Sequence, residues 1–125
     1  MGIWVNLEGL EREVQCRCVN CDNEHVYSEK EELYSSNTTH NLGAMASEVG
    51  IYKAIWRPEE IGILKAHQLI QILKDGITRL RDEREHCEQF NASNGWGTYK
   101  QFVPWVQDYL NACIEYPDAD VRVSR

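Results

Sequence analysis

Apolar residues follow a strand-like pattern in the first third of the chain and a helical pattern after it. A short apolar-rich run, Ile3–Leu7, predicts a strand, and Gly9 predicts a turn after that strand. Leu33–Ser35 is a further short segment that can extend the sheet. We therefore expect the chain to begin with β-structure.

A hairpin with a cysteine-rich tip is predicted at about residues 12–30. Val14–Cys18 alternates apolar with polar residues, which is the period of a half-buried strand. Asn20–Asn23 has turn chemistry, because Asn and Asp tolerate left-handed backbone and cap their own turns. His25–Ser28 then returns as the partner strand, so the cysteines lie at the turn.

Two short helices are predicted after the polar cluster Ser36–Asn41. Apolar residues spaced by three, one and three positions mark one helical face: Leu42, Met45, Ala46 and Val49. Gly50 is a typical C-terminal stop for that helix. A second helical turn covers Ile51–Trp56 and ends before Pro58, because the residue ahead of a proline is pushed out of helical geometry.

The clearest helix runs from about Lys65 to Arg84. Its apolar stripe repeats at helical spacing: Ala66, Leu69, Ile70, Leu73, Ile77 and Leu80. Gly76 lies inside this helix, where a glycine costs about 1 kcal/mol relative to alanine. A close packing partner over Gly76 is one reason to have a glycine there.

The last predicted helix follows the loop Asn91–Gly97, which we expect to be ordered around a buried or half-buried Trp96. Thr98 can cap that helix. One face carries Phe102, Val106, Tyr109, Leu110 and Cys113. Pro104 is harmless only in the first turn, so we expect the regular helix to begin nearer Phe102 than Thr98, or to bend.

The end of the chain completes the predicted architecture. Val121–Val123 reads as a terminal strand, and a strand at each end suggests that the two meet in one antiparallel sheet. No internal repeat or linker divides the chain. We predict a single α+β domain over residues 1–125, with a small antiparallel sheet built from the N-terminal hairpin and the C-terminal strand. Three to four helices pack on one face of that sheet.

The composition agrees with a folded domain and constrains its surroundings. Hydrophobic residues make up 42% and charged residues 26% of the 125 residues, unlike a disordered chain. The formal net charge is −7, which weighs against a broad nucleic-acid-binding face. No apolar run approaches the roughly 20 residues that span a bilayer, and the N-terminus lacks the pattern of a signal peptide. We expect a cytoplasmic protein without a membrane or nucleic-acid partner.

Cysteine spacing supplies the strongest local chemical motif. The chain has five cysteines, and the crowding of Cys16, Cys18 and Cys21 favours reduced thiols or a metal over a disulfide framework. Cys18 and Cys21 have the spacing of a zinc knuckle, and Cys16 and His25 could complete a structural tetrahedral site, with His40 as another candidate ligand. No second cysteine pair follows, so the alternative is a hairpin with free thiols.

A second candidate site consists of polar and aromatic residues: His40, Asn41, Trp56, Arg57, Asn94, Trp96 and Tyr99. Arg can pair with a phosphate, Trp and Tyr can stack on a base, and Asn can read the edge of an adenine. This set predicts a pocket for a nucleotide-like ligand. The alternative is that the tryptophans belong to the core while the asparagines cap turns and helices.

Four segments carry distinctive motifs: Asn37–Ala46, Gly50–Glu60, Phe90–Tyr99 and Pro117–Arg125. These motifs resemble a family of small, mostly uncharacterised phage and prophage proteins. The resemblance covers most of the chain from Asn37 onward, and it implies a viral origin and expression inside a bacterial cell. It brings no assigned reaction and no catalytic residue.

These observations predict a non-enzymatic phage accessory protein in the host cytoplasm, with a role in anti-defence or host takeover. No nucleophile and base pair is visible in the sequence, and the preferred mechanism is sequestration of a nucleotide-like signal. One alternative is an inhibitor that docks on a host protein, either a defence effector or a nucleic-acid-binding protein, because complementary charge speeds encounter. Another is a zinc-stabilised structural module. A homo-oligomer is compatible with each of these three functions.

Overall fold

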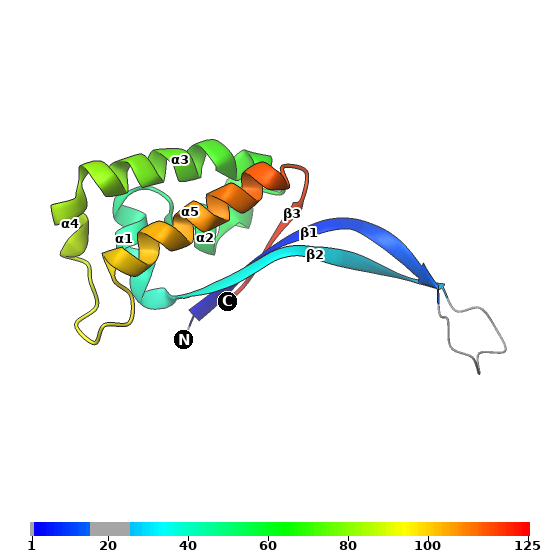
Figure 1. The fold of residues 1–125 in the computed structure, drawn as a ribbon, viewed down its shortest axis with the longest axis horizontal. Helices are drawn as coiled ribbons and strands as arrows, with labels where there is room; N and C mark the ends of the chain where they lie inside the picture. Colours follow the sequence, from blue (N-terminus) through cyan, green and yellow to red (C-terminus); the bar gives the residue numbers. More distant parts are fainter. Residues whose placement is uncertain (1, 16–25) are drawn as a thin grey trace.

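A computed structural model describes the backbone of residues 2–15 and 26–125 and the side chains of residues 2–9 and 32–125. Three strands, five α-helices and two 3-10 helices are described, in an α+β fold (Figure 1). In chain order they are β1 (Gly2–Gln15), β2 (Val26–Thr39), η1 (His40–Leu42), α1 (Gly43–Glu48), α2 (Tyr52–Trp56), η2 (Pro58–Ile61), α3 (His67–Asp82), α4 (Arg84–Glu88), α5 (Tyr99–Glu115) and β3 (Asp120–Ser124).

The two ends of the chain meet in one antiparallel sheet, as the sequence predicts. The strand order is β2-β1-β3, and β1 pairs with β3 from Trp4 opposite Ser124 to Glu8 opposite Asp120. Ile3, Val5 and Leu7 alternate along β1 and are completely buried, because the helices pack against that face. Trp4 points to the opposite face and is 51% exposed.

The N-terminal hairpin is longer than the sequence suggests. The predicted turn at Gly9 is wrong, because β1 and β2 remain paired as far as Gln15 opposite Val26. The pairing register shifts between Leu7 and Glu8 and again between Glu8 and Glu11, so Gly9 lies at an irregularity within the strand. These shifts occur where the pairing of β1 with β3 stops, at Glu8 opposite Asp120, and beyond them β1 and β2 continue as a two-stranded arm away from the helices (Figure 1).

The first helices follow the predicted pattern closely. Helix α1 ends before Gly50, which has a φ of +80° that few other residues adopt easily, and α2 ends before Pro58. Helix α3 matches the predicted helix near residues 65–84. A Cβ at Gly76 would clash with the side chain of Ile51, which is the close partner that the glycine suggested. The sequence pattern did not predict the short helix α4 as a separate element.

Helix α5 begins at Tyr99, so of the two predicted alternatives, a later start or a bend, the start nearer Phe102 is wrong. The side-chain oxygen Oε1 of Gln101 accepts hydrogen bonds from the N–H groups of Gly97 and Thr98, each at 3.1 Å. These bonds satisfy donors that have no partner within a helix, and they stabilise an earlier start. Pro104 therefore lies inside the helix.

The core between the sheet and the helices is dominated by large side chains. Trp56, Tyr109 and Phe102 are the largest that are fully buried, and they come from α2 and α5. Tyr34 on β2 stacks on Tyr109 with ring centroids 5.9 Å apart, which fixes β2 against α5. None of the helices in the described part of the chain is both long and apolar enough to cross a bilayer.

Candidate functional site

A cavity of about 580 Å³ lies at the end of β2. It is lined by three segments: Asn37–Thr39 of β2, the loop residues Gly95–Gly97, and Gln101 with Trp105 on α5, together with Gly2 and Leu42. The strand is distant in sequence from the loop and from the helix that follows it, so the tertiary fold assembles this cavity. Its lining is mainly apolar and includes two indole rings together with amide and hydroxyl groups.

Trp96 is the most exposed large hydrophobic residue at this cavity. Its side chain is 72% exposed, so the expectation of a buried or half-buried tryptophan is wrong. Gly95 and Gly97 on either side have φ values of +78° and +109°, which turn the chain sharply and direct the indole outward. A large apolar side chain at such exposure is a typical feature of a contact surface.

Two of the predicted asparagines hold Trp96 in place. The backbone N–H of Trp96 donates to Oδ1 of Asn94 at 3.0 Å, and Nδ2 of Asn41 donates to the carbonyl oxygen of Trp96 at 2.8 Å. Asn41 is 55 residues away in sequence and ties the loop to η1. Their role in the described structure is positioning, since both bind the Trp96 backbone.

Trp105 is a residue of this cavity that the sequence reading missed. Its Nε1 donates to the carbonyl oxygen of Asn37 at 2.9 Å, and its ring stacks on Phe102 at 6.3 Å. It lies three residues after Phe102, at the border of the apolar face of α5. An indole at such a border could have been recognised as a residue that is half buried and carries a polar group toward the surface.

Trp56 and His40 lie together, and neither lines this cavity. Trp56 is 1% exposed, so its ring belongs to the core, where it stacks on Tyr52 with centroids 5.4 Å apart. Its Nε1 donates to Nδ1 of His40 at 3.0 Å. The N–H group of the buried indole thus has the imidazole of His40 as its hydrogen-bond acceptor.

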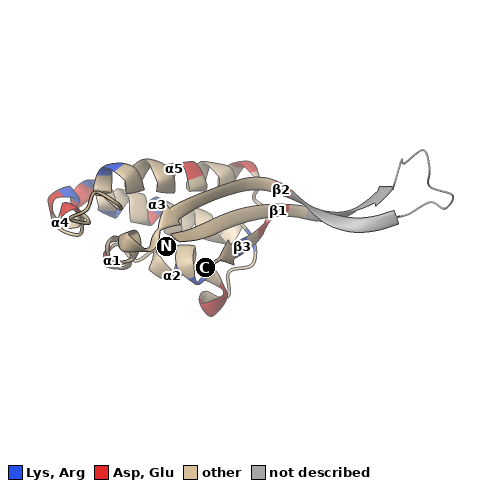
Figure 2. Cartoon of the chain, turned by 90° about the horizontal axis from the view of Figure 1, so that it is seen from below, with Lys and Arg blue, Asp and Glu red and all other residues tan. Residues whose placement is uncertain are grey.

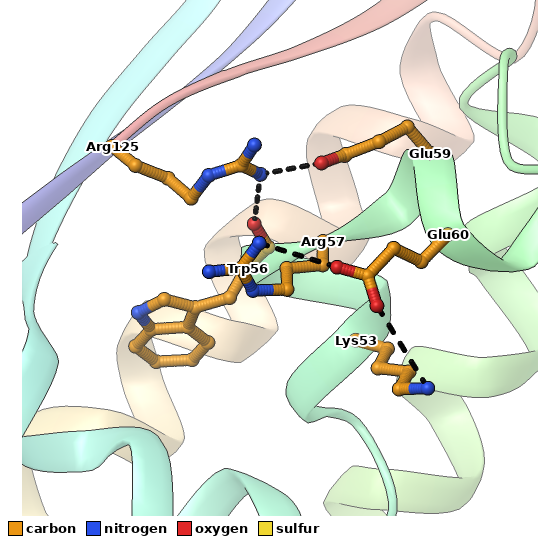
Figure 3. A network of polar contacts seen from close by, with 6 residues as sticks. All are labelled: Lys53, Trp56, Arg57, Glu59, Glu60 and Arg125. Carbon is orange, nitrogen blue, oxygen red and sulfur yellow. Dashed lines mark hydrogen bonds and ion pairs between the residues drawn. The ribbon is translucent and has the colours of Figure 1, made fainter.

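Arg57 belongs to a network of ion pairs on the surface of α2 and η2 (Figure 3). Its Nη1 donates to Oε2 of Glu60 at 3.2 Å, and Nζ of Lys53 lies 3.9 Å from Oε1 of the same carboxylate. Hydrogen bonds to Tyr52 and then to Glu60 raise the pKa of Arg57, whose guanidinium is held in place by these partners. The guanidinium of Arg57 is therefore already bound to side chains of the same surface.

The C-terminal residue completes the same network (Figure 3). Nη1 of Arg125 donates to the carbonyl oxygen of Trp56 at 2.8 Å and to Oε1 of Glu59 at 2.6 Å. A backbone hydrogen bond at Glu59 and the bond from Arg125 lower the pKa of the Glu59 carboxyl. The network anchors the end of β3 to α2, and its charges are paired with one another.

Tyr99 also has a structural position. It is 8% exposed and its hydroxyl donates to the carbonyl oxygen of Leu80 at 2.9 Å, which joins α5 to α3. The guanidinium of Arg84 lies 5.4 Å from the ring centroid. Of the seven residues predicted to bind a ligand, Trp96 lines the cavity at the end of β2, and the other six do not.

The predicted zinc ligands Cys16, Cys18, Cys21 and His25 all lie outside the described residues. Within the described part of the chain, no group of three or more His, Cys, Asp or Glu residues could hold a metal ion. The two cysteines of that part, Cys87 and Cys113, are buried free thiols. Burial raises the pKa of both thiols, that of Cys113 to about 12, so they remain protonated and unreactive at neutral pH.

Comparison with known proteins adds no further guide to this site. No protein-family model, no curated protein and no solved structure matches the chain.

Proposed function

We propose that this chain is a non-enzymatic phage accessory protein that acts inside the bacterial cell by docking on a host protein, with Trp96 as the anchor of the contact. The observation that carries the proposal is the 72% exposure of an indole whose backbone is held by two asparagine side chains. Tryptophan is enriched among the residues that dominate binding energy at protein interfaces. An anchor whose backbone is already held loses less conformational entropy on binding than one on an unheld loop.

Protein docking fits the cavity better than capture of a nucleotide-like signal does. None of the described residues that line the cavity is basic, so no side chain there can form an ion pair with a phosphate. Arg57, the cation in the predicted set, is engaged by Glu60 at 3.2 Å on α2 and η2. Amides, hydroxyls and indole rings instead suit the mixed polar and apolar surface of a protein partner.

The phage origin and an anti-defence role rest on the resemblance of Asn37–Ala46 and the three later motifs. The net charge of −7 supports a host partner with a basic surface, because opposite charges increase the rate of encounter. Nucleic-acid-binding proteins of the host are the partners with this property.

The test is a comparison of two exposed tryptophans. Tagged wild type, Trp96→Ala and Trp4→Ala are expressed in infected host cells, and the captured proteins and small molecules are identified by mass spectrometry. Trp4 is the matched control, because it is 51% exposed but lies on the outer face of the sheet. We expect one host protein to be retained by wild type and Trp4→Ala and to be lost with Trp96→Ala, by about 30-fold for a residue that contributes about 2 kcal/mol.

Two outcomes contradict the proposal. Equal capture of host proteins by wild type and Trp96→Ala would show that Trp96 does not contribute to the contact. A nucleotide that copurifies in a one-to-one ratio, and raises the melting temperature of the purified protein, would favour the sequestration mechanism instead.

A further inference from the structure

The outer edge of β2 carries backbone groups that can accept another strand. β2 pairs with β1 on one side, and its other side has no neighbouring strand within the described part of the chain. The carbonyl of Asn37 faces this side and there accepts the hydrogen bond from Nε1 of Trp105, so α5 already engages this one edge group. Ser35 lies two residues earlier, so its N–H and C=O point in the same direction.

Two cavities lie along this edge between β2 and α5, and together we name them the β2–α5 groove. It comprises the cavity of about 580 Å³ beside Asn37–Thr39 and a second cavity of about 460 Å³ beside Leu33–Ser36. The side formed by α5 runs from Gln101 and Trp105 in the first cavity to Asp108 and Glu115 in the second. Seven strand residues at about 3.3 Å each span about 23 Å, which accommodates an extended segment of five to seven residues.

The charge of the β2–α5 groove defines its occupant. Asp108 and Glu115 are its charged lining residues among those described, and both are acidic (Figure 2 colours acidic residues red). A second copy would bring acidic groups against acidic groups, in a chain whose net charge is already −7. A segment with Lys or Arg at alternate positions would direct these side chains at α5 while its backbone pairs with β2.

We infer that the β2–α5 groove receives an extended, basic segment of the partner protein, which pairs with the edge of β2 as a fourth strand. This inference rests on the proposed function, since it states how the host protein is held beside Trp96. Backbone pairing supplies affinity, and the two carboxylates of α5 supply selectivity for basic side chains.

The test uses synthetic seven-residue peptides that alternate Val with Lys or Val with Glu, labelled for fluorescence polarisation. A third peptide carries the Val–Lys sequence with N-methyl groups along one edge, so that it cannot form strand hydrogen bonds. We expect the Val–Lys peptide to bind at least tenfold more tightly than either of the other two. Equal binding of all three peptides would overturn the inference.

Variants of the edge separate backbone pairing from general attraction. Ser35→Pro removes the outward N–H of β2 without removing a backbone hydrogen bond to β1, and proline is tolerated at such edge positions. We expect it to weaken binding of the Val–Lys peptide at least fivefold. Ser35→Ala is the matched control, because it removes only the hydroxyl that donates to Oδ1 of Asn6 at 2.8 Å, and we expect less than a twofold change. Unchanged binding by Ser35→Pro would contradict strand pairing.

Charge reversal provides a second test that does not depend on the strand. The double variant Asp108→Lys with Glu115→Lys is expected to reverse the preference, so that the Val–Glu peptide binds more tightly. The control Asp82→Lys with Glu85→Lys makes the same change in net charge at exposed positions of α3 and α4. If both double variants change peptide binding equally, the selectivity comes from net charge and the inference fails.

The inference and the proposed function can fail separately. A host protein that is lost with Trp96→Ala but retained by Ser35→Pro and by the Asp108 and Glu115 double variant would keep the proposed function and reject the groove. Binding of the Val–Lys peptide, with no host protein retained in the capture experiment, would keep the groove and reject the proposed function. A stable dimer of the purified protein that Ser35→Pro dissociates would identify a second copy as the occupant and overturn the inference.

Discussion

Nε1 of Trp56 donates a hydrogen bond to Nδ1 of His40, 3.0 Å away, and joins the buried ring of α2 to the start of η1. Both residues were predicted to contact a ligand, but in the fold each is the partner of the other. The bond gives the indole N–H an acceptor at a place where the rest of the ring is 1% exposed. His40 therefore has a structural role that can be measured.

We predict that His40→Ala lowers the free energy of unfolding by about 1–2 kcal/mol, because a donor on a buried ring is left without its acceptor. Urea denaturation monitored by circular dichroism measures this change. In a Trp56→Phe background, the same substitution should cost less than about 0.5 kcal/mol, since no donor remains. Equal costs in the two backgrounds would show that the bond contributes nothing.

Gly76→Ala should destabilise the protein, although alanine in a helix normally gains about 1 kcal/mol over glycine. The reason is the side chain of Ile51, which occupies the space that the added methyl group requires. We expect a net loss of about 1–3 kcal/mol, as for overpacked cores, measured as a lower urea midpoint. The double variant Gly76→Ala with Ile51→Ala should be less destabilised than the sum of the single variants. A stabilised Gly76→Ala would contradict the packing.

Cys113 should make stability decrease at high pH. Burial raises the pKa of its thiol to about 12 from an ordinary value of 9.0, so between these values the unfolded chain loses a proton that the folded chain retains. The unfolding free energy then falls with pH by up to about 1.4 kcal/mol per unit. Below pH 8, the difference between wild type and Cys113→Ala should be constant. Above pH 9, denaturation measurements should show wild type losing stability relative to the variant, and parallel curves up to pH 11 would contradict the shift.

The predicted zinc site at Cys16, Cys18, Cys21 and His25 requires a direct metal measurement. Protein purified without chelator should contain about one zinc ion per chain, measured by mass spectrometry of the metal. The double variant Cys18→Ser with Cys21→Ser should contain none, because two of the four ligands are removed. A control double variant, Cys87→Ser with Cys113→Ser, alters the buried thiols of α4 and α5 and should retain the metal if it folds. Metal well below one equivalent in the wild type would reject the site.

The sequence predicts the regular elements well where one periodicity dominates. The apolar stripe from Leu69 to Leu80 locates α3, and Gly50 and Pro58 mark ends that depend on local backbone geometry. The sheet formed by the two chain ends follows from strand patterns at both termini. The predicted start of α5 was wrong because Gln101 accepts hydrogen bonds from the N–H groups that precede the helix. The position of Pro104 in the sequence does not reveal this contact.

The candidate site was less predictable, because exposure depends on neighbours that are distant in sequence. Trp56 and Trp96 have the same side chain, and both lie near asparagine, arginine or glycine. One is enclosed by the helices, and the other is turned outward by Gly95 and Gly97. The two glycines are a local difference, but whether they turn the indole outward or into the core depends on the packing of elements distant in sequence.

By itself, the sequence determined the α+β class, the main helical stripes and the pairing of the chain ends. These features depend on the alternation of side chains along a strand or helix, which is a local property of the backbone. Only the tertiary structure decided that Asn37, Trp96 and Trp105 border one cavity and that Arg57 is held elsewhere by Glu60. Such arrangements depend on how separate elements pack, and that packing is settled by the whole core at once.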